Sequence, residues 1–149
     1  MQREYPDRPL IGVGAVIIDR GRALVVRRAA EPLQGEWSIP GGVLELGETL
    51  RTGVAREAKE ETGLDVLPIE VLDVDDRILA DPDGRTRYHY VLIDYLCEVA
   101  GGELRAASDA TEVRWVTRAE LDGGFSIADA AGEVIRKGLA KAGKRSGPP

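Results

Sequence analysis

Hydrophobic residues follow two different spacings along this chain, and the change between them predicts strands and helices in an interleaved order. Residues 11–18 form a nearly continuous apolar run rich in β-branched side chains, and a second apolar run, residues 23–26, follows the polar turn 19–22. Two such runs joined by a short polar turn predict a β-hairpin. Because the first run is apolar at almost every position, we expect its strand to be buried on both sides.

A second pair of strands is predicted farther along the chain. Residues 66–79 alternate loosely between apolar and polar, residues 88–99 are largely apolar, and the turn sequence Asp-Pro-Asp-Gly at 81–84 lies between them. This pattern predicts a long antiparallel pair. A short strand is expected at 112–116.

Helical spacing and capping residues predict a helix over residues 50–62. Thr49 can cap its first turn, and Gly63 can end it by taking the left-handed conformation that other residues avoid. A last helix is expected from Ser126 to about Lys141, on the same reasoning. Strands interleaved with two helices predict an α/β/α sandwich with a mixed β-sheet.

The ends of the chain are expected to lie outside this framework. Residues 1–9 are polar and carry two prolines, so we expect an extended arm that pairs at a sheet edge or at a homodimer contact. Residues 142–149 are basic and contain Gly and Pro, which predicts a disordered tail. The sequence therefore predicts a single domain, residues 1–141.

The buried face of the 50–62 helix changes from apolar to acidic. At 100° per residue Leu50, Val54, Glu57 and Glu61 share one stripe, and Glu60 lies one step round from it. Burying carboxylates is costly, so a cation should compensate their charge. Oxygen ligands with no nearby Cys or His favour Mg²⁺ or Mn²⁺ over zinc. The alternative for these glutamates taken alone is a solvated acidic face.

The surrounding spacing distinguishes these alternatives. Gly42 is followed by five residues, Glu48, seven residues, and then the run REAKEETGL at 56–64. This pattern resembles the complete Nudix box, with every fixed position filled, and WSIPG at 37–41 is similar to the usual approach to it. The resemblance implies the Nudix fold and a reaction in which divalent metals hold a pyrophosphate while water attacks one phosphorus.

The resemblance also implies roles for single residues. Metal ligands would come from the box and its approach, namely the carboxylates of Glu57, Glu60 and Glu61 and the backbone carbonyl of Gly41. Glu57 and Glu60 would thereby be catalytic, together with Arg56, which would orient the carboxylates. The loop and helix would be supported by Gly42, Glu48 and Gly63.

Candidates outside the box have an ordinary structural interpretation as well. Arg28 either reaches a substrate phosphate or is a surface charge. Asp109 and Glu112 are candidates for substrate binding, a further metal ligand or the general base, with solvated loop charge as the alternative. Tyr88 and Tyr90 face the same side of their strand, where either could stack on a base or pack against other side chains.

Charge and composition narrow the class of partner. The 149 residues carry a net charge of -6, which argues against long nucleic acid, because such binding needs many basic contacts to phosphates. A small phosphate substrate remains compatible when divalent ions lie between the two negative groups. No signal peptide or membrane-spanning run is present, so a soluble cytoplasmic protein is expected. Cys97, the one cysteine, is expected in the core.

The substrate is less closely specified than the reaction. The stretches 87–95 and 112–116 look most like small bacterial ADP-ribose pyrophosphatases, which implies a nucleoside diphosphate linked to another moiety, such as ADP-ribose or a nucleotide sugar. Pro82 lies later than the proline that marks this substrate class. A MutT-like hydrolase of oxidised nucleoside triphosphates is the alternative enzyme, and a nucleotide-sensing module without catalysis is the alternative of another class.

Overall fold

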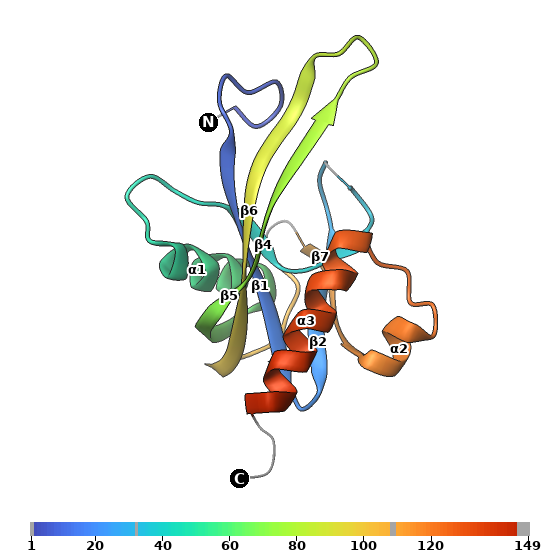
Figure 1. Cartoon of the computed structure of the whole chain (residues 1–149). Helices are drawn as coiled ribbons and strands as arrows, with labels where there is room; N and C mark the ends of the chain where they lie inside the picture. Colours follow the sequence, from blue (N-terminus) through green and yellow to red (C-terminus); the bar gives the residue numbers. More distant parts are fainter. Residues whose placement is uncertain (1, 32, 108–109, 146–149) are drawn as a thin grey trace.

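The computed structural model describes residues 2–31, 33–107 and 110–145, which form one mixed sheet with helices packed on both faces (Figure 1). The elements in chain order are β1 (Leu10–Asp19), β2 (Arg22–Arg28), β3 (Trp37–Ser38), β4 (Gly41–Val43), α1 (Leu50–Thr62), β5 (Leu64–Ala80), β6 (Thr86–Gly102), β7 (Ala110–Thr117), α2 (Arg118–Asp122) and α3 (Asp129–Arg145). No helix in the described ranges is both long and apolar enough to span a membrane.

Strand β1 is the centre of the sheet. It pairs in parallel with β6, from Leu10 opposite Tyr90 to Ile17 opposite Cys97, and antiparallel with β2 and β4. The predicted hairpin of β1 and β2 is present, but only two residue pairs next to the turn join the strands. Beyond that turn β3 takes the place of β1 beside β2, and β4 takes the place of β2 beside β1, while β7 pairs with the other edge of β2 along its whole length. This divergence opens the sheet where the site lies.

Alternate residues of β1 supply two cores. Val13 and Ile17 belong to the cluster beneath α1, whereas Val16 and Ile18 belong to the cluster beneath α3. The expectation that this strand is covered on both faces is confirmed. Cys97 is fully buried in the α1 cluster, as expected for a small core residue.

Strands β5 and β6 are each 17 residues long and extend beyond the rest of the sheet (Figure 1). The residues ahead of β1 form an arm beside the end of this hairpin, where the Tyr5 amide donates to the Arg87 carbonyl (2.7 Å). The first of the two expectations for the arm, contact at a strand, therefore describes it in this chain.

Helix α3 begins and ends later than expected. It continues to Arg145, so residues 142–145 belong to the helix rather than to the tail expected there. Ala142 packs against the α3-side core, and Arg145 pairs with Glu98 of β6 (3.3 Å). These contacts explain the extra turn, and residues 146–149 lie outside the described residues.

Candidate functional site

Helix α1 is fixed at both ends as the sequence predicts. The Thr49 hydroxyl accepts a hydrogen bond from the Thr52 amide (3.1 Å), and Gly63 takes the left-handed conformation with φ 77°. The face turned to the sheet carries Val54, Glu57 and Glu61, so the apolar-to-acidic stripe is buried.

Arg56 lies at the centre of the acidic residues. It donates to both oxygens of Glu48, from Nε (2.6 Å) and from Nη2 (2.9 Å), and from Nη1 to Glu57 Oε1 (2.8 Å) and to Glu60 (3.3 Å). A further hydrogen bond reaches the Val43 carbonyl (3.1 Å). The hydrogen bonds with Glu48 are the largest cause that raises the pKa of Arg56 and lowers the pKa of Glu48. Arg56 therefore contacts three glutamates of the box at once, and its orienting role in catalysis stays a prediction.

Glu48 supports the loop ahead of α1. Besides its pair with Arg56, its Oε1 accepts a hydrogen bond from the Glu45 amide (3.0 Å). A side chain at Gly53, on the first turns of α1, would lie 3.0 Å from the same oxygen. Glu48 is therefore held between the loop and the helix, in agreement with the supporting role expected for it.

Two box glutamates approach the backbone that precedes the helix. Glu61 is 4% exposed, and its Oε1 accepts a hydrogen bond from the Gly41 amide (2.8 Å). Glu57 is 8% exposed, and a Cβ at Gly42 would lie 2.4 Å from its carboxylate carbon. Gly42 is thus required because any side chain there would displace Glu57.

Burial leaves the charge of Glu57 only partly compensated. Desolvation raises the pKa of Glu57, and the ion pair with Arg56 offsets this only in part. A divalent cation beside this carboxylate would favour its ionised form. The oxygen-only donors of Glu57 and Glu61 suit Mg²⁺ or Mn²⁺, so the residues present fit such an ion.

The third glutamate stands apart from the other two. Glu60 is half exposed and pairs with Arg56 (3.3 Å) rather than turning toward the cavity. Within the described ranges no three or more His, Cys, Asp or Glu side chains are gathered closely enough to hold a metal ion. Ligation by all three glutamates and the Gly41 carbonyl therefore stays a prediction.

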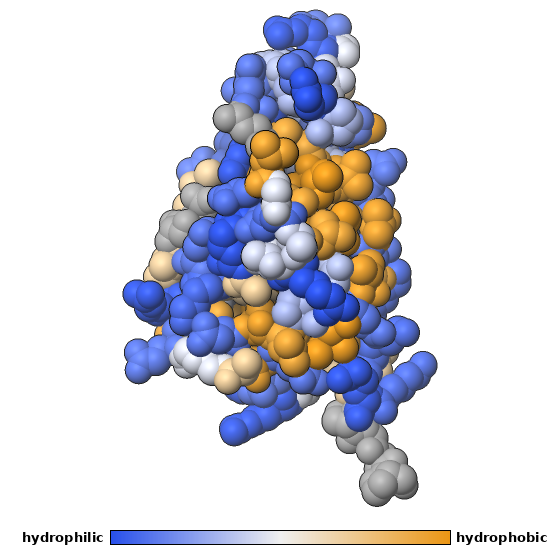
Figure 2. Space-filling model, turned by 90° about the vertical axis from the view of Figure 1, so that its left-hand side faces the viewer, coloured by the Kyte–Doolittle hydropathy of each residue, from blue (hydrophilic) through white to orange (hydrophobic). Residues whose placement is uncertain are grey.

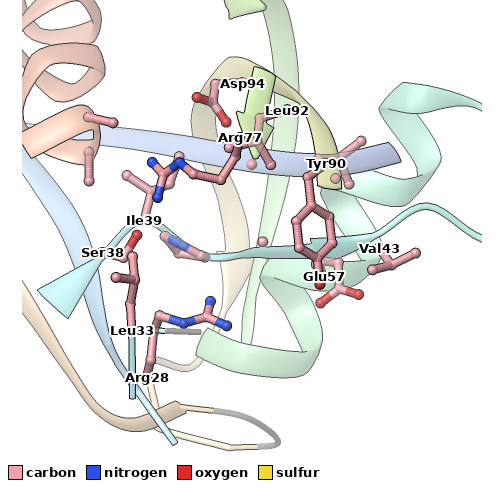
Figure 3. A pocket seen from close by; sticks show the side chains of 18 of the residues that line it. Arg28, Leu33, Ser38, Ile39, Val43, Glu57, Arg77, Tyr90, Leu92 and Asp94 are labelled. Carbon is pink, nitrogen blue, oxygen red and sulfur yellow. The ribbon is translucent and has the colours of Figure 1, made fainter. Parts of the chain in front are cut away.

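A cavity of about 190 Å³ lies beside Glu57 and Glu61 (Figure 3). Its walls include Arg28 from the end of β2 and Arg77 from β5, whose side chains approach from different sides in Figure 3. Arg28 thus lies at the wall of this cavity, and its contact with a substrate phosphate stays a prediction. Tyr90 also lines the cavity, whereas Tyr88 is buried away from it.

Several wall residues were not found by sequence reasoning. Cross-strand pairing places Asp73 opposite Asp94, Asp75 opposite Leu92 and Arg77 opposite Tyr90, so one face of β5 and β6 turns toward the cavity. The available signal was a charged residue at every second position from 73 to 77. This alternation indicates which residues line the cavity only when the register of β5 against β6 is known. Arg3 of the arm, which was also missed, lines the cavity as well.

Asp94 lies deep in the wall opposite the box. Its carboxylate packs on Gly14, where a Cβ would come within 2.3 Å of Oδ1. Burial raises the pKa of Asp94 to about 6, with smaller contributions in the same direction from Asp73 and Asp75. The cavity therefore has a second carboxyl group whose charge is disfavoured.

Glu112, one of the two acidic candidates of the late loop, is not brought to the box. Glu112 on β7 is exposed and pairs with Arg27 (3.0 Å), and it does not line the cavity. The pairing of β7 with the outer side of β2 explains this position, which gives no support to Glu112 as a general base. Asp109 lies outside the described residues.

Comparisons with known proteins agree with the fold and the box. The NUDIX domain profile matches residues 8–137. An ADP-ribose pyrophosphatase of Methanocaldococcus jannaschii is 36% identical over 107 residues, covering 72% of this chain and 61% of that protein. A MutT-like protein of Streptomyces ambofaciens is 42% identical over 108 residues, covering 72% of this chain and 63% of that protein. The chain thus matches under two thirds of the length of these two relatives.

A solved structure extends the similarity to almost the whole fold. The crystal structure of a MutT NUDIX hydrolase from Burkholderia pseudomallei superposes with a TM-score of 0.70 at 27% identity, covering 88% of this chain and 98% of that one. The profile match and these similarities agree with the intact box and the mixed sheet, and the chain belongs to the Nudix hydrolase family.

Proposed function

We propose that this protein is a Mg²⁺- or Mn²⁺-dependent pyrophosphohydrolase that cleaves the diphosphate of a nucleoside diphosphate linked to another moiety, with ADP-ribose or a related nucleotide sugar as substrate. The observation that carries this proposal is the pair of buried carboxylates, Glu57 and Glu61, on the wall of a cavity that also carries the cations Arg28 and Arg77. Such a cavity offers oxygen ligands to a metal and guanidinium groups to phosphates.

Each group has a definable task in this reaction. A bound divalent ion would supply charge neutralisation and a polarised water. Arg56 holds Glu57 and Glu60 by hydrogen bonds and so restricts their movement. Arg28 is assigned to the substrate phosphates. Glu112, the candidate for the general base, does not line the cavity, so the general base is not assigned.

ADP-ribose is preferred because apolar side chains from two separate parts of the chain line the cavity. They are Tyr90 and Leu92 of β6, and Ala30 and Leu33 after β2. A diphosphate that bridges two bulky groups needs room on both sides, and the archaeal relative is named for hydrolysis of ADP-ribose. We include a cytoplasmic location in this proposal, since nucleotide metabolites of this kind are cytoplasmic.

A MutT-like hydrolase of oxidised nucleoside triphosphates is the second candidate, supported by the name of the Streptomyces relative. A triphosphate needs one base pocket, for which Tyr90 provides an aromatic ring. The alternative of another class, a nucleotide sensor without catalysis, is disfavoured by the intact box.

The experiment is a substrate screen with product identification. Purified protein with Mg²⁺ is given ADP-ribose, NADH, dNTPs and diadenosine polyphosphates, and chromatography identifies the products. We expect AMP and ribose 5-phosphate from ADP-ribose, and no turnover after EDTA treatment. Glu60→Gln should reduce turnover at least about tenfold because one of the predicted metal ligands is lost, whereas Glu133→Gln, on the exposed side of α3, should not.

Other outcomes distinguish the alternatives. Release of a nucleoside monophosphate and pyrophosphate from a dNTP, with ADP-ribose left intact, would establish the second candidate. Binding of ADP-ribose without any turnover would establish a sensor. Full activity of Glu60→Gln would remove that residue from the site.

A further inference from the structure

The N-terminal arm, residues 2–9, brings an arginine to the cavity. Arg3 lines the same cavity as Glu57 and Tyr90, although some fifty residues or more separate it from them in sequence. Burial raises the pKa of Glu57 and of Tyr90, and the positive charge of Arg3 acts in the opposite direction on both. The guanidinium group is therefore within electrostatic reach of a candidate metal ligand and of the aromatic wall.

Contacts around Tyr5 fix the arm to the end of the β5–β6 hairpin. The Tyr5 amide donates to the Arg87 carbonyl (2.7 Å), and its hydroxyl donates to the Asp81 carboxylate. Arg85 lies over the Tyr5 ring at 4.2 Å, and Glu4 pairs with Arg87 (2.8 Å). An arm with four such contacts has a defined course, and Figure 1 shows it beside the hairpin.

The arm also turns sharply just after Arg3. Tyr5 has φ 50°, a left-handed conformation that is uncommon for any residue except glycine. The Gln2 amide donates to the carbonyls of Glu4 (2.9 Å) and Tyr5 (3.3 Å) and closes this turn. The strained backbone is held by these contacts, and the turn places Arg3 at the cavity instead of along the hairpin.

In the described part of the chain no hydrogen bond or ion pair involves the side chain of Arg3. Arg77 of the same cavity shares this state, whereas Arg56 and Arg87 are held by carboxylates. A guanidinium group whose five N–H donors are all available suits two-point contact with an oxyanion. Lysine would offer the charge without that planar geometry.

We propose that Arg3 is a substrate-binding residue that donates hydrogen bonds to a phosphate of the diphosphate, and that the contact between Tyr5 and Asp81 positions it. This inference rests on the proposed function, since it assigns a further group to the same substrate. It makes the arm part of the site that holds the carboxylates of the box.

The test is calorimetric binding of methylenediphosphonate, a diphosphate that is not hydrolysed, in the presence of Mg²⁺. Arg3→Ala should weaken binding at least tenfold, and Arg3→Lys should restore part of the loss. Arg8→Ala is the matched control, because Arg8 is on the same arm but is exposed and pairs only with Asp7. It should bind like the wild type, and all variants should keep the wild-type melting temperature.

A separate measurement tests whether the contact between Tyr5 and Asp81 positions Arg3. Tyr5→Phe removes the hydroxyl that donates to Asp81, and it should raise KM for the nucleotide substrate severalfold with little change in kcat, because a binding contact is lost. A lower kcat with an unchanged KM would overturn this role.

The outcomes separate this inference from the proposed function. Equal affinity of Arg3→Ala and Arg8→Ala for methylenediphosphonate would overturn the assignment of Arg3, and so would a wild-type protein that binds no diphosphate with Mg²⁺. If no nucleotide is hydrolysed but Arg3→Ala still loses diphosphate binding, the proposed function fails while the role of Arg3 stands.

Discussion

Two carboxyl groups, Glu57 and Asp94, face the same cavity in different surroundings. Glu57 is hydrogen-bonded to Arg56, whereas Asp94 has no hydrogen bond within the described ranges and feels the positive charge of Arg77 only at a distance. Burial raises the pKa of both groups, which means that each costs folding free energy when it is ionised.

This cost gives a prediction for Asp94. Its pKa in the folded protein is raised to about 6, so below the ordinary aspartate pKa the group is neutral in both states and costs nothing. As pH rises from about 4 to 6 the ionised form is increasingly penalised in the folded state, and the loss of stability is complete above that window. Asp94→Asn should therefore raise the melting temperature at pH 8 relative to the wild type.

The check is a series of melting temperatures from pH 4 to pH 8. The advantage of Asp94→Asn should shrink on acidification and be smallest near pH 4. Asp83→Asn, at the exposed hairpin turn, is the control and should show no such trend. A pH-independent difference between Asp94→Asn and the wild type would contradict the raised pKa.

At this scale the sequence predicts some site residues and not others. Glu57, Glu61 and Arg56 were predictable because one helix fixes their spacing. Arg77 and Asp94 were not, because their convergence depends on the register of β5 against β6, which has shifts at four places. A one-residue change of register would turn these side chains to the other face.

Among the elements, α1 depends most on a single terminal residue. Gly63 ends the helix with φ 77°, and a Cβ there would lie 2.1 Å from the carbonyl oxygen of Glu103. Two costs therefore oppose a side chain at this position, the left-handed backbone and a clash with backbone that follows β6. This close approach of Glu103 means that the end of α1 is packed against the backbone that follows β6.

Gly63→Ala separates these costs when it is compared with Gly21→Ala. Gly21 has a similar φ of 73° but nothing within 4 Å of the added Cβ, so it reports the backbone cost alone, about 1 kcal/mol. Gly63→Ala should lose a further ~1–3 kcal/mol because of the clash. Urea unfolding measures both, and equal losses would show that the backbone beside Gly63 yields without cost.

The ends of a helix could be predicted where a capping residue or a left-handed glycine marks them in the sequence. Thr49 and Gly63 define α1 to the residue, because a cap and a left-handed turn are local. The last helix was placed too early and too short, since its extra turn depends on contacts of Ala142 and Arg145 with the sheet. The split of β2 from β1 was not foreseen either, because it depends on the short strands β3 and β4, which pair with the facing edges of β2 and β1.

On the scale of the whole molecule, the sheet is longer than the helix that covers it. Helix α1 has 13 residues and is roughly 20 Å long, whereas β5 has 17 residues and spans about 56 Å. The strand face beyond α1 is left with exposed aliphatic side chains, at Ile11, Val71, Val74 and Ile78. Figure 2 shows hydrophobic residues gathered on this side of the molecule.

We expect a second copy of the chain to cover this apolar face, as a homodimer. β5 is the outer strand of the sheet, and apolar patches of several hundred Å² on soluble proteins mark interaction sites. A two-fold axis would pack the two copies of the face against each other. The surface area buried would then approach the ~800 Å² per partner of a stable interface. Light scattering after size exclusion should give twice the monomer mass at micromolar concentration.

Lysine substitutions on this apolar face test whether it forms the homodimer interface. Val74→Lys combined with Ile78→Lys should yield monomers, because a charge on each copy would be buried. Leu46→Lys is the control, since Leu46 is fully exposed in the loop ahead of α1 and lies off this face. A wild-type protein that is monomeric at tens of micromolar would contradict the homodimer.

The course of the arm also decides how the protein can be joined to other molecules. The arm contacts β6 at Arg87, whereas the end of α3 contacts it at Glu98, and the extended strand from one residue to the other spans roughly 35 Å. A purification tag or fluorescent fusion placed ahead of Gln2 would emerge beside the cavity and compete with the substrate for space. The same fusion attached after α3 would leave from the far end, which makes it the appropriate choice for kinetic work.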